Sequence, residues 1–89
     1  MNKTKEYFKE HPKEISKKLR TFRTLMNLSL EDVGNEMMLS KQQIWNIENN
    51  GCKVYYYLIA FSAVYNIDIL AFFDEEVYIS ELEKIIRRN

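Results

Sequence analysis

Two helix-start patterns, eleven residues apart, constrain the fold of this chain more than any other feature. One begins at Ser29, with Asp32 three positions later, and the other begins at Ser40, with Gln43 three positions later. In such a capping box the Ser oxygen accepts a hydrogen bond from an otherwise unpaired helix N–H. The later side chain then accepts one from the backbone N–H of the Ser. Each pattern therefore predicts the first turn of a helix.

Hydrophobic residues strengthen both starts. Leu28 precedes the first Ser and matches Val33, which is the spacing of a hydrophobic staple. Leu39 precedes the second Ser and matches Ile44 in the same way. Two helix starts so close together require a short helix, a tight turn and a second helix whose outward side is polar. The sequence thus predicts a helix-turn-helix over about residues 30–49, the architecture that enters the major groove of DNA.

The composition favours an all-α fold in one small domain. The chain has 89 residues, of which 46% are hydrophobic, and it contains only two Gly and one Pro, so helix breakers are few. Apolar residues recur at helical spacing, whereas no segment alternates for long as a strand does. The spacing predicts helices over residues 12–26, 30–38 and 41–49, a fourth helix with Leu58, Phe61 and Tyr65, a short fifth turn with Ile67, Leu70 and Phe73, and a last helix with Ile79, Leu82 and Ile86.

Local signals predict where several of these helices begin and end. Pro12 suits the first position of a helix, because its missing N–H needs no partner there. Asn27 and Asn66 tolerate a positive φ, so we expect them to end the first and fourth helices. Asp74 is a suitable cap for the last helix.

We therefore expect three segments. Residues 1–11 offer only Tyr7 and Phe8 as an apolar pair, so they are expected to form an N-terminal extension with little support for a helix. Residues 12–74 are predicted to form a helix-turn-helix domain. Residues 75–89 are predicted to add a C-terminal amphipathic helix.

Charge is distributed unevenly along the chain although the net charge is zero. Residues 1–26 carry eight Lys and Arg residues against three Glu, so the remainder of the chain is acidic. Such an asymmetry can orient a molecule on a polyanion such as DNA. A solvated helix face is the simpler explanation of the same charges.

Several function classes have no support in the sequence. Cys52 and His11 are single copies without ligand or catalytic spacing, and no Gly-rich phosphate loop is present. We therefore expect neither an enzyme nor a metal ion or other cofactor. The lone Cys excludes an internal disulfide and fits a reducing compartment. No apolar run approaches the ~20 residues of a membrane span and no signal peptide is visible, so we expect a cytoplasmic protein without membrane contact.

A wider set of residues matches a known pattern: Leu19-Arg20-Thr21-Phe22-Arg23, Leu28-Ser29, Val33-Gly34, Leu39-Ser40, Ile44 and Ile47-Glu48. With them, residues 19–73 resemble the Cro-like, phage-repressor-type helix-turn-helix family of lambda-repressor-like DNA-binding domains. The resemblance implies a five-helix repressor-like domain in which Gly34 is the small residue where two helices cross closely. It also implies that Val33, Met37, Ile44 and Ile47 are buried.

The chain departs from the family pattern at three places. Met38 stands at the turn position where the family usually has Gly, which predicts a strained turn. Leu30 stands where the family often has a Gln that contacts phosphate, which predicts the loss of that contact. The link from Glu48 to Leu58 is also about one residue shorter than usual.

The resemblance implies which residues contact DNA. Lys suits guanine acceptors, and Gln or Asn can bond adenine through two hydrogen bonds. The expected base contacts are Lys41, Gln42, Trp45 and Asn46. The expected phosphate contacts are Lys17, Ser40, Asn49, Lys53, Tyr55 and Tyr56. Arg23 and Glu48 match a structural ion pair that ties the first helix to the recognition helix.

Alternatives remain open for some of these residues. The polar residues of the second helix also fit any exposed helix surface. Trp45 could meet a thymine methyl or a sugar, anchor a protein partner, or tuck against the base of the fourth helix. Tyr55 and Tyr56 could be partly exposed core residues.

The sequence thus favours a sequence-specific transcriptional regulator, acting as a repressor, that binds double-stranded DNA as a homodimer with helix 41–49 in the major groove. Ile79, Leu82 and Ile86 are the predicted dimer contacts, with packing of their helix onto its own domain as the alternative. The neutral charge, the acidic tail and Trp45 also fit a protein-interaction module of the same fold, such as an antitoxin-like or adaptor protein with a protein partner.

Overall fold

The structure, a computed structural model, describes the backbone of residues 2–88 and the side chains of residues 6–88. It is all-α, and no strand occurs within the described part of the chain. The elements in chain order are α1 (Asn2–Glu10), α2 (Pro12–Leu25), α3 (Leu30–Met37), α4 (Lys41–Asn50), α5 (Tyr55–Tyr65), the 3₁₀ helix η1 (Ile69–Phe72) and α6 (Glu75–Arg88). The predicted helices over residues 12–26, 30–38 and 41–49 are confirmed to within one residue at each end.

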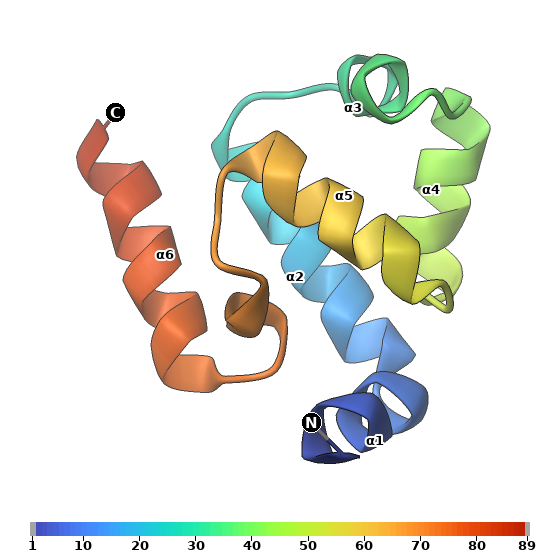
Figure 1. Ribbon diagram of the computed structural model, residues 1–89. Helices are drawn as coiled ribbons and strands as arrows, with labels where there is room; N and C mark the ends of the chain where they lie inside the picture. Colours follow the sequence, from blue (N-terminus) through green and yellow to red (C-terminus); the bar gives the residue numbers. More distant parts are fainter. Residues whose placement is uncertain (1, 89) are drawn as a thin grey trace.

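Helices α2 and α5 form the centre of the molecule (Figure 1). Helices α3 and α4 lie to one side of them, and α6 lies on the opposite side. The first apolar stripe predicted from the sequence fills this centre, because Ile15, Leu19 and Phe22 are completely buried. The rest of the buried hydrophobic core is Val33, Ile44, Cys52, Leu58, Phe61, Tyr65, Ala71, Phe72 and Ile85.

Both capping boxes are confirmed. The Ser29 oxygen accepts a hydrogen bond from Asp32 N (2.9 Å), and Asp32 Oδ2 accepts one from Ser29 N (2.8 Å). Ser40 and Gln43 make the same pair of bonds, at 3.1 and 2.8 Å. Both bonds of each box satisfy a backbone N–H that the helix itself leaves unpaired, so α3 and α4 begin where the sequence predicts.

Close contact between α3 and α4 depends on Gly34. A Cβ atom at this position would lie 2.6 Å from the carbonyl oxygen of Leu39, in the turn that leads into α4. Because the obstacle is backbone, any larger residue would push the two helices apart. The expectation that a small residue is needed at this crossing is confirmed.

Three helices end at residues in the left-handed conformation. Asn27 (φ 58°) and Asn66 (φ 54°) end α2 and α5, as predicted. Met38 (φ 58°, ψ 38°) occupies the turn between α3 and α4, so the predicted strain at this position is present. Its side chain is almost fully exposed.

The structure corrects two expectations, one about the N-terminal residues and one about the fifth turn. Residues 2–10 form helix α1, although their sequence gave little support for one. The helix is held by tertiary contacts, because the Tyr7 ring packs edge-on against Phe73 (6.0 Å between centroids) and the Phe8 ring against Tyr55 (5.5 Å). A nine-residue helix is too short to be stable without such contacts.

The fifth turn buries other residues than predicted. Ala71 and Phe72 are fully buried, whereas Leu70 is exposed and Ile67 and Phe73 are only partly covered. The turn is a 3₁₀ helix whose start is capped by Asp68. Ile67 precedes this helix and Phe73 follows it, so the predicted residues do not form one helical face, and the helix turns Ala71 and Phe72 inward.

Helix α6 packs onto its own domain, against η1 and α2 (Figure 1). The predicted cap is confirmed, because Asp74 Oδ1 accepts hydrogen bonds from Glu76 N and Val77 N. The inward side of the helix presents Glu81 and Ile85, which are buried, and Tyr78. The Tyr78 ring packs edge-on against Phe22 at 5.4 Å. Packing onto its own domain, the alternative considered for this helix, is therefore what the structure shows.

Candidate nucleic-acid interface

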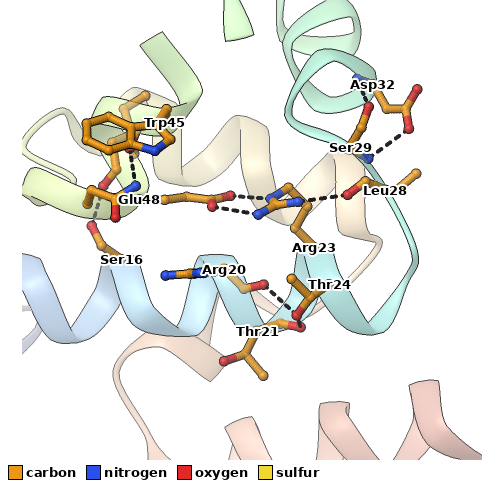
Figure 2. Close-up of polar contacts among 12 residues, drawn as sticks. Ser16, Arg20, Thr21, Arg23, Thr24, Leu28, Ser29, Asp32, Trp45 and Glu48 are labelled. Atoms are coloured by element: carbon orange, nitrogen blue, oxygen red, sulfur yellow. Dashed lines mark hydrogen bonds and ion pairs between the residues drawn. The ribbon is translucent and has the colours of Figure 1, made fainter. Parts of the chain in front are cut away.

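A buried ion pair fixes the position of α4 on α2. Arg23 Nε donates to Glu48 Oε2 (2.7 Å), and Arg23 Nη2 donates to Glu48 Oε1 (3.1 Å) (Figure 2). The side chain of Glu48 is 1% exposed and that of Arg23 is 14% exposed. The hydrogen bond to Glu48 raises the pKa of Arg23 above its usual value, although burial acts in the opposite direction. The predicted structural ion pair is confirmed.

Two further hydrogen bonds strengthen the attachment of α4 and the loop before α3 to α2. Arg23 Nη1 donates to the carbonyl oxygen of Leu28 (2.9 Å), so the same guanidinium also holds the loop before α3. The hydroxyl of Ser16 donates to the carbonyl oxygen of Ile47. Helix α4 is thus anchored through both its side chains and its backbone, and its opposite face is left free.

That free face carries the residues predicted to contact bases. Lys41, Gln42 and Asn46 are exposed on α4. Gln42 Nε2 donates to Asn46 Oδ1 at 3.5 Å, so the two amides lie side by side one helical turn apart. A row of amides next to a Lys offers both donors and acceptors to base edges.

Trp45 lies at the edge of this face that borders α2. It is 45% exposed and lines a hollow of about 230 Å³ together with residues of α2, α3 and α4. The alternative that it tucks against α5 is wrong, because the residues around the hollow are Arg20, Arg23, Leu30, Trp45, Glu48 and Asn49. Trp45 therefore lines a hollow to which Lys41, Gln42 and Asn46 do not contribute, although it shares their helix.

The residues predicted to contact phosphates lie at three places around α4. Lys17 is exposed on α2. Ser40 and Asn49 mark the two ends of α4, and the Asn49 amide donates to the carbonyl oxygen of Trp45 (2.8 Å). Lys53 is exposed in the loop between α4 and α5 and lines a second hollow with Phe8, Lys9 and Pro12.

Tyr55 and Tyr56 differ from each other. The Tyr55 ring lies between those of Phe8 (5.5 Å) and Phe73 (6.4 Å), which makes it a partly exposed part of the packing between α1, α5 and η1. Tyr56 is 73% exposed at the start of α5. Of the two, only Tyr56 presents most of its surface to solvent.

Ion pairing separates the cations of the molecule into two groups. On α6, Glu75 pairs with Lys18 of α2 at 3.5 Å. Glu81 pairs with Lys84 of the same helix at 2.9 Å. Within the described residues, by contrast, the Lys and Arg side chains around α4 other than Arg23 form no ion pair; they are Lys13, Lys17, Arg20, Lys41 and Lys53. Unpaired positive charge therefore lies around α4, although Lys9 on α1 and Arg88 on α6 also form no ion pair within the described residues. Acidic residues are found both around α6 and on α3, next to α4.

Sequence reasoning did not select Arg20 as a site residue. Arg20 precedes Arg23 by three positions on a helix, so the two share a face of α2. That spacing is a signal that could have placed Arg20 beside α4.

The two single-copy residues have structural surroundings. Cys52 is fully buried, and burial raises its pKa to about 11, so the thiol stays protonated at neutral pH. His11 lies 3.4 Å from Glu14 and against the Tyr7 ring. Nowhere in the described part of the chain do three or more His, Cys, Asp or Glu side chains gather as a metal ion requires.

Comparison with protein-family models, with curated proteins and with solved structures finds no match to this chain. The likeness to Cro-like helix-turn-helix proteins therefore stays a prediction. Among the described helices, none is both long enough and apolar enough to cross a membrane.

Proposed function

We propose that this protein is a sequence-specific DNA-binding transcriptional regulator, acting as a repressor, and that α4 enters the major groove of double-stranded DNA. The observation that carries the proposal is the exposed face of α4 with Lys41, Gln42 and Asn46, on a helix whose other side is locked by Arg23 and Glu48. A rigid helix with a free face of amides and a Lys suits the reading of base edges. As part of the same proposal the protein acts in the cytoplasm.

The distribution of charge supports this proposal. Apart from Arg23, the Lys and Arg side chains around α4 have no carboxylate partner in the described residues, so they are available to phosphate oxygens. Helix α6, which carries Glu75, Glu76, Glu81 and Glu83, lies on the side of the molecule opposite to α4, which favours one orientation on a polyanion.

We further propose that the protein binds as a homodimer through α6. The side of α6 next to its buried face presents Ile79 and Ile86, which are 49% and 59% exposed, and the partly covered Leu82. The helix thus packs on its own domain and still leaves apolar surface for a second copy. A two-fold dimer would place two copies of α4 in successive turns of the major groove.

Selection of binding sites from random DNA tests the proposal. We expect a palindromic site with half-sites about one helical turn apart. On that site Gln42→Ala and Asn46→Ala each lower affinity by about 1–3 kcal/mol and relax the choice at one base pair. Ser80→Ala, on the exposed side of α6, serves as the control that leaves affinity unchanged. Failure to select any site, or full affinity in both Ala variants, would refute the proposal.

A second candidate function is a protein-interaction module of the same fold, antitoxin-like or an adaptor. It is favoured by α5, which has no charged residue along its length and exposes Tyr56 and Ile59. Heparin chromatography separates the two candidates, because a protein that contacts phosphates is retained and then released steeply by salt. An interaction module with zero net charge would pass through the column.

A further inference from the structure

The hollow beside Trp45 is a place where three helices meet at the edge of the proposed DNA-binding face. Arg20 comes from α2, Leu30 is the first residue of α3, and Trp45 and Asn49 lie one turn apart on α4. Figure 2 shows Arg20 and Trp45 on opposite sides of the buried pair of Arg23 and Glu48. The pair of Arg23 and Glu48 thus forms the floor of the hollow, and Arg20 and Trp45 form two chemically different walls.

The floor contributes no net charge. Both oxygens of Glu48 accept hydrogen bonds from Arg23, and the remaining Arg23 nitrogen donates to the carbonyl oxygen of Leu28. The two side chains are therefore satisfied by each other and by the backbone. Any ligand in the hollow is held by its walls.

One wall is a free cation. Arg20 is exposed, and within the described residues its guanidinium makes no hydrogen bond and no ion pair. Its five N–H donors are arranged in the planar fork that suits a phosphate group. The charge of Arg20 is thus unopposed inside the hollow.

The other wall is apolar. Trp45 leaves nearly half of its surface uncovered, which is unusual for the residue type that gains most from burial. Leu30 continues this wall from α3. Asn49 lies at the rim, with its amide N–H already donated to the carbonyl oxygen of Trp45. A ligand that suits both walls has an anionic part and an apolar part.

The volume limits the choice of ligand. The hollow measures about 230 Å³, less than the ≈ 300 Å³ at which pockets for drug-sized molecules begin. Two of its lining residues, Trp45 and Asn49, follow Gln42 on α4 by three and seven positions and so share its side of the helix, where a bound polymer would pass. One phosphodiester with its deoxyribose is an anionic group joined to a largely apolar ring, which fits these walls.

We propose that Arg20 and Trp45 form a sequence-independent binding site for the DNA backbone, in which the guanidinium pairs with a phosphate and the indole packs against the adjoining deoxyribose. This inference rests on the proposed function, because it needs α4 in the groove. It assigns to Trp45 a role in positioning the protein on DNA and not in reading a base. It also supplies a phosphate contact next to Leu30, whose side chain cannot make one.

The test measures binding to a fluorescent DNA duplex of mixed sequence, about 30 base pairs long so that it spans two half-sites. Affinity is measured from 50 to 200 mM salt for the wild type, Arg20→Ala and Trp45→Ala. Arg88→Ala removes the same charge from the exposed end of α6 and is the matched control. Thermal melts establish that each variant is folded.

Arg20→Ala is expected to lower affinity and to reduce the slope of log K against log salt by about two, because each bound dimer loses two phosphate contacts. Its deficit relative to the wild type therefore shrinks about tenfold between 50 and 200 mM salt, a consequence of the slope of ≈ 0.9 per phosphate. Trp45→Ala is expected to lower affinity with an unchanged slope, because it removes no charge. Arg88→Ala keeps the wild-type slope.

Fluorescence provides a second measurement, since Trp45 is the only Trp of the chain. Its emission is expected to become protected from acrylamide quenching when the duplex is added, and the protection is expected to weaken in Arg20→Ala. A wild-type slope and affinity in Arg20→Ala, or an equal change in Arg88→Ala, would overturn the site while leaving the proposed function intact. Absence of any DNA binding by the wild type would overturn both.

Discussion

At the scale of single residues, the turn between α3 and α4 holds Met38 in a conformation that costs an L-residue about 1–2 kcal/mol. Glycine adopts this conformation without that cost, but it loses more chain entropy on folding. Because the Met38 side chain is 93% exposed, its removal sacrifices little packing.

We predict that Met38→Gly stabilises the protein by about 0.5–1 kcal/mol and raises the melting temperature by about 2–8 °C, measured by circular dichroism. Asn27→Gly is the matched control, because Asn already tolerates a positive φ and gains less. A lower melting temperature for Met38→Gly would show that the side chain stabilises the turn.

Tyr65 has a buried hydroxyl without a hydrogen-bond partner in the described residues. Its ring stacks between Phe22 and Phe61, and no group of the described residues forms a hydrogen bond with its hydroxyl. Burial raises the pKa of this hydroxyl well above its usual value, with the nearby Glu48 carboxylate acting in the same direction. A buried hydroxyl in this state lowers the stability of the fold.

Tyr65→Phe is expected to stabilise the protein by about 1 kcal/mol, seen as a higher midpoint of urea unfolding with an unchanged slope. Tyr7→Phe is the comparison, because its hydroxyl donates to Glu14 (3.2 Å) and its loss should give no such gain. Destabilisation by Tyr65→Phe would mean that the hydroxyl is hydrogen-bonded to a buried water.

At the scale of elements, Arg23 and Glu48 join α2, α4 and the loop before α3 into one unit. Glu48→Ala leaves the Arg23 guanidinium buried without its carboxylate, so we predict a loss of about 3 kcal/mol of stability. Glu48→Gln keeps an acceptor for one hydrogen bond and is expected to lose less. It also provides a folded variant if the Ala variant unfolds.

A double-mutant cycle isolates the coupling between the two residues. Arg23→Ala is expected to cost little extra in the Glu48→Ala background, with a coupling energy of about 1–3 kcal/mol by urea unfolding. Strictly additive losses of stability would contradict the ion pair between Arg23 and Glu48 seen in the structure.

At the scale of the whole molecule, α6 both covers the core and carries the apolar surface proposed for the dimer. Removal of α6 would uncover Phe22 and remove the buried Ile85, so a truncated chain cannot separate the two roles. Substitution of its exposed residues can separate them.

We predict that Ile79→Glu combined with Ile86→Glu converts a dimer into a folded monomer, measured by light scattering. Ser80→Glu adds a charge on another exposed side of the same helix and should leave the dimer intact. A monomeric wild type, or a dimer that survives the double substitution, would remove α6 from the interface.

The sequence by itself determined the local elements. The capping boxes at Ser29 and Ser40, the left-handed ends at Asn27 and Asn66 and the 3.6-residue apolar spacing all act within a few residues, so their consequences are readable from short segments. The pairing of Arg23 with Glu48, 25 positions apart, was predictable only through resemblance to a family.

Only the tertiary structure decided the rest, because it depends on contacts between distant segments. Helix α1 exists through aromatic contacts with Tyr55 and Phe73, which no local pattern in residues 2–10 encodes. The side of α6 that is buried was likewise set by the shape of η1 and α2, since its apolar stripe is wider than one contact face. The hollow between Arg20 and Trp45 arises where three helices meet, and for that reason sequence reasoning missed it.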